Sequence, residues 1–147
     1  MNPPNHIPLS QDAALVAALA GTAMPFSHSA EDQAERWLRA LRLHGQVGTA
    51  MQALGVGEAP LLTRSDSAPE VGYVTPPLGD DAVDRVVKLA CDHATERGAG
   101  AVCTTDLLHA LFEVYDGLLG RALYLRGASA EELLQQLAAT SATVEPA

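Results

Sequence analysis

The sequence has few basic residues, few β-branched residues, few cysteines and no long apolar run. It holds 9 Lys and Arg against 18 Asp and Glu, a formal net charge of −9, and a single Lys, Lys88, stands among the basic residues. The Arg are spread singly, whereas nucleic-acid binding needs clustered cations that neutralise phosphates, so we expect no nucleic-acid partner. No apolar run reaches the ~18 residues of a membrane span, and we therefore expect no membrane partner.

Two further shortages bear on location. The apolar stretch 13–24 has the composition of a signal-peptide core, but no Lys or Arg precedes Arg36, so the positively charged region is missing. Two cysteines, Cys91 and Cys103, are too few for a disulfide framework, and we interpret them as small buried hydrophobes, with a redox role as the alternative. We expect a cytoplasmic protein in which residues 13–24 form a helix.

Composition and periodicity predict an all-α fold. Ala and Leu together number 47, whereas Val and Ile number 12, and helix formers in that excess disfavour sheets. Within 80–97, apolar residues recur at helical spacing on one face. The length of 147 residues is enough for one domain with its own core. We expect a single domain, 1–147, with flexible ends at 1–8 and 140–147.

About eight helices are predicted, separated by Gly-containing breaks. They cover 10–20, 30–43, 47–54, 58–62, 80–97, a segment from Thr104 or Thr105 as N-cap to 115, 118–125 and 130–139. The last begins at Ser129, which forms a capping-box signature with Glu132. Between the two groups of four, residues 63–79 are rich in Ser, Pro and Gly, which is typical of a linker.

The two halves of the chain can be superposed as sequences. The segment beginning at Ala50 aligns with the one beginning at Ala122, an offset of 72, and the segment beginning at Trp37 aligns with the one beginning at Leu107, an offset of 70. We therefore predict a duplicated four-helix unit, with repeat one at about 10–62 and repeat two at about 80–139. Each unit is too small to bury its apolar face alone, so the two should pack about a pseudo-twofold axis.

Common catalytic and cofactor motifs are missing from the sequence. It contains no phosphate-binding Gly-rich loop, no nucleophile elbow and no paired-histidine zinc motif, so we predict no enzymatic activity, no cofactor and no metal site. We interpret the five scattered histidines as solvated or core-edge residues, a small enzyme with a His and a carboxylate in an inter-repeat cleft being the alternative. Trp37 is expected in the core rather than as a ligand platform.

Residues 80–137, with VCTTDLLHAL at their centre, resemble the second repeat of the Clp N-terminal domain, the two-repeat helical domain of the Clp-family AAA+ unfoldases. The family pattern is a long helix, a Gly, a Val before T-E-H-[LI]-L-L-x-L, an acidic-Gly break and a helix closing on L-G-V. AERWLRALRLHGQVGTAMQALGV, 34–56, is similar to the first repeat, whereas 10–29 fit poorly. With no Walker motif following, we expect a stand-alone form without the ATPase modules.

The resemblance implies a domain without catalytic activity that binds substrates, adaptor proteins and, in some members, phosphoarginine. It places the binding residues at Glu35 and Arg36 in repeat one and at Thr104, Thr105 and Asp106 in repeat two. Where the family has a Glu that holds the guanidinium, repeat one has Glu35 but repeat two has Thr105. Because Thr lacks the planar acceptor pair that a guanidinium needs, Asp106 would have to replace that carboxylate.

These observations predict a protein-binding module, acting as an adaptor, regulator or decoy of a Clp unfoldase or protease. Its partners would be proteins or peptides: a Clp ATPase, a Clp peptidase or their substrates, bound in grooves of the two repeats. The alternative is a repurposed helical scaffold that serves a partner outside the Clp system.

Overall fold

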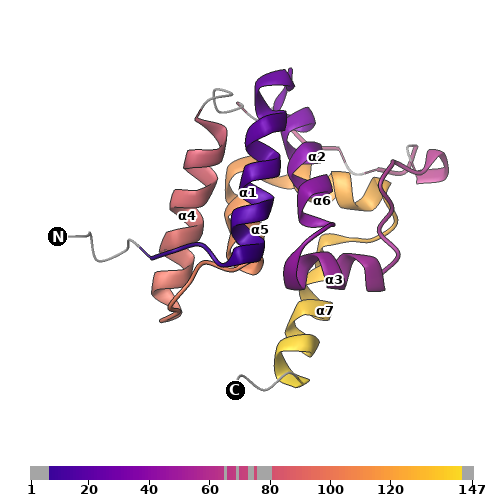
Figure 1. The fold of residues 1–147 in the computed structure, drawn as a ribbon. Helices are drawn as coiled ribbons and strands as arrows, with labels where there is room; N and C mark the ends of the chain where they lie inside the picture. Colours follow the sequence, from indigo (N-terminus) through magenta and orange to yellow (C-terminus); the bar gives the residue numbers. More distant parts are fainter. Residues whose placement is uncertain (1–6, 65, 69, 73–74, 76–80, 144–147) are drawn as a thin grey trace.

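The chain forms seven α-helices in a computed structural model that describes residues 7–64, 66–68, 70–72, 75 and 81–143 (Figure 1). They are α1 (Gln11–Ala23), α2 (Ala30–Leu41), α3 (Gly45–Ala53), α4 (Ala82–Glu96), α5 (Thr104–Tyr115), α6 (Gly117–Leu125) and α7 (Ala130–Thr143), with 3₁₀ turns η1 (Met24–Phe26) and η2 (Leu62–Arg64). These residues contain no regular strand, so the all-α prediction is confirmed. The predicted linker and flexible ends lie partly outside the described residues.

Short-range signals set the helix ends. The hydroxyl of Ser10 accepts a hydrogen bond from the backbone N–H of Ala13 at 3.1 Å and caps α1. The predicted capping box before α7 is confirmed: Ser129 N–H donates to the Glu132 carboxylate at 2.8 Å, and Glu132 N–H donates to the Ser129 hydroxyl at 3.0 Å. Gly98, with φ +72°, adopts the left-handed conformation just after α4.

The helix predicted at 58–62 does not form, so the first half of the chain, 7–64, holds three α-helices against four in the second half, 81–143. Pro60 has no backbone N–H and disfavours helical geometry in the residue before it. Leu61 N–H instead donates to the carbonyl of Leu125 at 2.6 Å, which ties this segment to the second half. The prediction of about eight helices is therefore wrong, because the helix expected at 58–62 does not form.

The start of α5 also differs from the prediction. Its N-cap is Cys103, not Thr104 or Thr105, because the carboxylate of Asp106 accepts a hydrogen bond from the backbone N–H of Cys103 at 2.9 Å. Asp106 thus occupies the third helical position, where a carboxylate satisfies an otherwise unpaired N–H and complements the helix dipole. Thr104 is the first helical residue and is buried.

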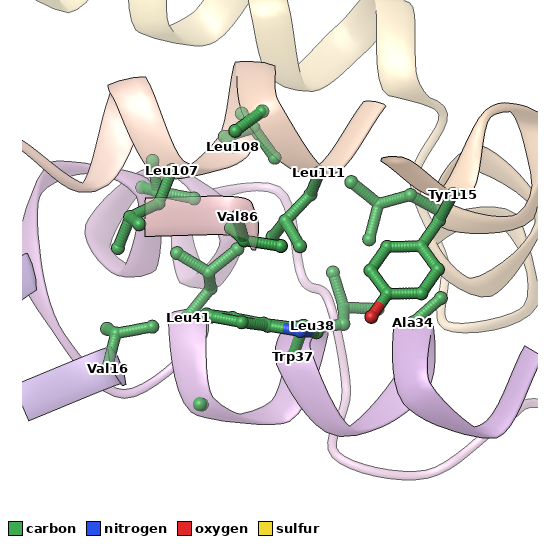
Figure 2. Close-up of a cluster of buried hydrophobic side chains, with 14 of the residues drawn as sticks. Val16, Ala34, Trp37, Leu38, Leu41, Val86, Leu107, Leu108, Leu111 and Tyr115 are labelled. Atoms are coloured by element: carbon green, nitrogen blue, oxygen red, sulfur yellow. The ribbon is translucent and has the colours of Figure 1, made fainter. Parts of the chain in front are cut away.

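One hydrophobic core joins the two halves. Trp37 is fully buried on α2, which confirms its interpretation as a core residue, and Figure 2 shows it among apolar side chains of α1, α4 and α5. The phenol of Tyr115, at the end of α5, donates to the side-chain carbonyl of Gln33 on α2 at 2.6 Å. Burial raises the pKa of Tyr115 to about 12, so the phenol stays protonated and remains the donor.

The halves also meet at close backbone contacts. Between them, the helix pairs with the most extensive contact are α2 on α6 and α3 on α5 and α7. Gly45 begins α3 with φ +75°, and a Cβ there would lie 2.6 Å from a methyl carbon of Thr104. Only glycine fits this approach, which lets Val47 N–H donate to the Thr104 hydroxyl at 3.4 Å. The start of α3 is therefore fixed against the start of α5.

We expect Leu108→Asp to unfold the protein, because Leu108 is fully buried on α5 and an unpaired buried carboxylate costs several kcal/mol. Asp84→Ala, at an exposed position in the first turn of α4, should change the free energy of unfolding by less than about 0.5 kcal/mol. Thermal and urea unfolding followed by circular dichroism measure both. Equal stability of the two variants would show that the facing of α5 described here is incorrect.

Candidate protein-binding surface

The α2 helix has a buried face and a cationic face. Its buried face carries Trp37, Leu38 and Leu41 into the core, and this fixes the rotation of the helix. On the other side, Arg36 and Arg39 follow at a spacing of three residues, and Arg42 lies just after the helix end. Because residues three apart are neighbours on a helix surface, the three guanidinium groups follow one side of α2.

An open pocket lies between this cationic face and the end of α1. Its volume is about 250 Å³, and it is lined by Leu19, Ala23, Arg36, Arg39, Ala40, Arg42, Leu43 and Glu58. Leu19 and Leu43 are large apolar side chains with 41% and 57% of their surface exposed. The volume is below the ~300–1,000 Å³ of typical small-molecule sites. We call this site the α1/α2 pocket.

The three arginines of the α1/α2 pocket differ in how they are held. The guanidinium of Arg36 contacts the Asp32 carboxylate at 3.1 Å and donates to the carbonyl of Ala23 at 3.3 Å. Arg42 donates from Nε to the carbonyl of Val56 at 2.8 Å. Arg39 is exposed and makes no hydrogen bond or ion pair with the residues that the structure describes. Its five N–H donors are therefore available to a partner.

The predicted site residue Glu35 lies one position from Arg36 but faces another surface. Its carboxylate accepts a hydrogen bond at 3.4 Å from the guanidinium of Arg126, whose side chain is only 3% exposed. Arg126 also donates to the carbonyls of Ala122 and Glu58, at 3.2 and 3.4 Å. Since a buried cation requires a neutralising partner, Glu35 serves the contact between α2 and the end of α6.

The predicted residues of the second half lie on two sides of α5. Thr104 faces α3, where its hydroxyl accepts the hydrogen bond from Val47, and Thr105 is half-buried. The buried carboxylate of Asp106 accepts from Nε and Nη2 of Arg97 at 2.9 and 2.7 Å, and from the Cys103 backbone. The five predicted residues therefore lie in separate places, and among them Arg36 alone lines the α1/α2 pocket.

Comparing α2 and α5 identifies a residue that the sequence alignment missed. Both helices have 12 residues, and their bounds differ by 104 − 30 = 74 at the start and 115 − 41 = 74 at the end, against the offset of 70 used above. With this register Asp32 matches Asp106: each occupies the third helical position and pairs with an arginine. Glu31 then takes the place of Thr105, one turn before Glu35.

Glu31 lines a second pocket, of about 480 Å³, with Asp66, Ala68, Glu70, Val71, Leu118 and Arg121. Its carboxylate pairs with the guanidinium of Arg121 on α6 at 2.9 Å. The signal that identifies Glu31 is the sequence Ser29-Ala-Glu-Asp, in which Ser29 caps α2 by accepting from Asp32 N–H at 3.0 Å.

A third pocket, of about 330 Å³, was not predicted and gathers side chains of α4 and α5. It is lined by His93, Glu96, Arg97, Asp106 and His109. The His93 ring lies 5.8 Å from that of His109 and contacts the Glu113 carboxylate at 3.2 Å. Partial desolvation and the nearby charge of His93 lower the pKa of His109. In the sequence, this cluster is indicated by Glu113, which lies four residues after His109 and therefore on the same helix face.

No group of three or more His, Cys, Asp or Glu in the described part of the chain could hold a metal ion.

Comparisons with known proteins add no assignment. The chain matches no protein-family model, and no curated protein matches it. Among the residues placed in the structure, no helix is both long and apolar enough to cross a membrane.

Asp106→Asn should lower the free energy of unfolding at pH 7 by about 1.5–3 kcal/mol, the range for hydrogen bonds to charged groups. Burial alone would raise the pKa of Asp106, but the hydrogen bonds from Arg97 and Cys103 N–H hold it below its ordinary value. This stabilisation is therefore present above the unfolded pKa of about 3.9 and is lost as pH falls through the lower folded pKa.

The difference between wild type and Asp106→Asn should consequently shrink in urea unfolding series taken from pH 7 to pH 3. Asp84→Asn, at an exposed position on α4, is the matched control and should track wild type throughout. A pH-independent difference for Asp106→Asn would contradict the contribution of the charged carboxylate.

Proposed function

We propose that this chain is a non-enzymatic protein-binding module built on a Clp-type duplication, and that it acts as an adaptor, regulator or decoy of a Clp unfoldase or protease system. The proposal is carried by one observation, which is that the same turn ends α3 and α6. It also uses the sequence resemblance given above and the exposed apolar and cationic surface of the α1/α2 pocket.

The two turns are alike in conformation and in hydrogen bonding. Gly55 and Gly127 both have positive φ, +80° and +116°, and lie 127 − 55 = 72 residues apart. In each turn the Gly N–H donates three residues back and the next N–H donates five residues back (Gly55 to Gln52, Val56 to Met51, Gly127 to Tyr124 and Ala128 to Leu123). The same turn also ends α4 at Gly98, so what supports a duplication is the place of the two turns, each after the third helix of its half. These are the positions at which the family's repeats close on L-G-V.

The packing of the helices also supports a duplication. Suppose that α1, α2 and α3 correspond to α4, α5 and α6, in that order. Exchanging the halves then converts the pair α2 with α6 into the pair α5 with α3. Both pairs are in contact. The pairs α1 with α4 and α2 with α5, which such an exchange leaves unchanged, are in contact as well. The two glycine turns lie together, since a Cβ on Gly127 would be 3.4 Å from the carbonyl oxygen of Gly55.

Departures within the candidate site favour the second candidate function, a scaffold for a partner outside the Clp system. Glu35 and Asp106 already pair with Arg126 and Arg97, so neither presents a carboxylate without a partner to a guanidinium ligand. Glu31, which takes the place of Thr105 in the structural register, is paired with Arg121, but half of its side chain is exposed. Binding measurements with Clp components distinguish the two functions.

The tagged protein should retain a Clp ATPase or Clp peptidase from a lysate of its source organism, as detected by mass spectrometry. The purified Clp component should then bind the purified chain in biolayer interferometry with a Kd of about 10 μM or tighter. Failure of every purified Clp ATPase and peptidase to bind, together with retention of one unrelated protein, would overturn the Clp function in favour of the alternative scaffold.

The control for this experiment must stay folded, because an unfolded chain would be captured by an unfoldase as a substrate. Leu43→Asp and Leu62→Asp are matched for this purpose, since both leucines are exposed, at 57% and 91%, and only Leu43 lines the α1/α2 pocket. Both variants should keep the circular dichroism spectrum and unfolding midpoint of wild type. If the Clp component binds through the α1/α2 pocket, Leu43→Asp should weaken its binding and Leu62→Asp should not.

A further inference from the structure

The outward face of α1 carries an apolar stripe that leads into the α1/α2 pocket. Leu15, Leu19 and Ala23 follow one another at intervals of four residues, and the first two are exposed at 42% and 41%. Side chains four apart lie above one another on a helix, so the stripe is continuous along α1. Leu43 adds a further apolar side chain at the pocket. Leu19 and Ala23 of the stripe lie beside the three arginines that line the pocket.

The charge of the pocket is opposite to that of the chain. Three of the nine basic residues, Arg36, Arg39 and Arg42, line it with one carboxylate, that of Glu58, and Arg36 is paired with Asp32 beside it. The pocket thus keeps an excess of positive charge, whereas the chain has a formal net charge of −9. The rest of the surface therefore repels polyanions, and the pocket is a local site for negative charge. A guanidinium can hold a carboxylate with two parallel hydrogen bonds, and Arg39 has no partner among the described residues.

We propose that the α1/α2 pocket binds an acidic amphipathic segment of a partner protein, with leucine-like side chains on the α1 stripe and Asp or Glu side chains on Arg36, Arg39 and Arg42. This inference rests on the proposed role as a protein-binding module and adds the chemistry of the partner. A helix with apolar residues at i, i+3, i+4 and i+7 presents such a face, and helices of this type bind in apolar grooves of other proteins.

The test uses a fluorescein-labelled peptide of about twelve residues, with Leu at those four spacings and Asp or Glu elsewhere, titrated with the full chain in fluorescence polarisation. A second peptide with Lys in place of each acid is the charge control. Wild type should bind the acidic peptide at least about tenfold more tightly than the basic one, despite its net charge of −9, and the affinity should fall as NaCl rises.

Charge reversal locates the site. Arg39→Glu should weaken binding of the acidic peptide about tenfold and strengthen binding of the basic one. Arg85→Glu, an exposed arginine of α4 outside the pocket, is the matched control and should leave both affinities unchanged. Equal affinity of wild type and Arg39→Glu for the acidic peptide would overturn the inference, as would preference of wild type for the basic peptide.

A lipid surface would use the same leucines and arginines, so anionic vesicles of phosphatidylglycerol and phosphatidylcholine form a separate arm. Sedimentation of wild type but not Arg39→Glu with these vesicles, without binding of the acidic peptide, would overturn the peptide assignment. Failure of the proposed Clp function gives a different result from failure of this inference. If only the Clp function is wrong, the acidic peptide binds at Arg39 while no Clp component binds the chain. If instead a Clp component binds equally to wild type and Arg39→Glu, the inference fails while the proposed function holds.

Discussion

The burial of one face of α2 against α5 is the constraint on which the rest of the structure depends. Trp37 and Leu41 are fully buried on α2, as are Leu107 and Leu111 on α5, and truncation of a buried Trp to Ala costs about 3–5 kcal/mol (Figure 2). The 2.6 Å hydrogen bond from Tyr115 to α2 adds a directional contact. With its rotation fixed in this way, α2 must turn its arginines toward α1 and solvent, and the α1/α2 pocket follows from the core.

The same packing makes each half depend on the other. Polar contacts that cross between them include Val47 N–H to the Thr104 hydroxyl, Leu61 N–H to the Leu125 carbonyl, and Arg126 to Glu35. Separating the halves would expose the apolar surface that the shared core buries and would break these hydrogen bonds, and both changes oppose separation. The first half lacks a fourth helix, and the backbone of 57–61 instead pairs with the end of α6.

Local signals account for most of what the sequence predicts. Helical periodicity, capping residues such as Ser129 and glycines such as Gly98 act within a few residues, so the helices and their ends follow from the sequence. The helix expected at 58–62 is wrong because Pro60 and a long-range hydrogen bond of Leu61 outweigh local composition. When α2 and α5 are matched by their ends, the correspondence of their residues is shifted by four, about one helical turn, from that of the sequence alignment. The sequence alone does not reveal this shift, because a shift of four residues keeps the same helix face apolar. Partners such as Arg126 for Glu35 lie about ninety residues apart, and no local pattern indicates them.

Charge pairing within the fold decides which groups remain for a partner. Glu35 and Asp106, acidic residues that the resemblance assigns to binding, neutralise Arg126 and Arg97 inside the structure. The Glu35 carboxylate cannot turn to a ligand without leaving the buried guanidinium of Arg126 unpaired, which costs several kcal/mol. The Asp106 carboxylate is itself buried, and its pairing with the half-exposed Arg97 holds it inside the structure. Arg39 has no such obligation and is exposed beside apolar side chains. The sign of charge offered at the α1/α2 pocket is thus positive in an acidic protein, and the proposed partner is correspondingly acidic.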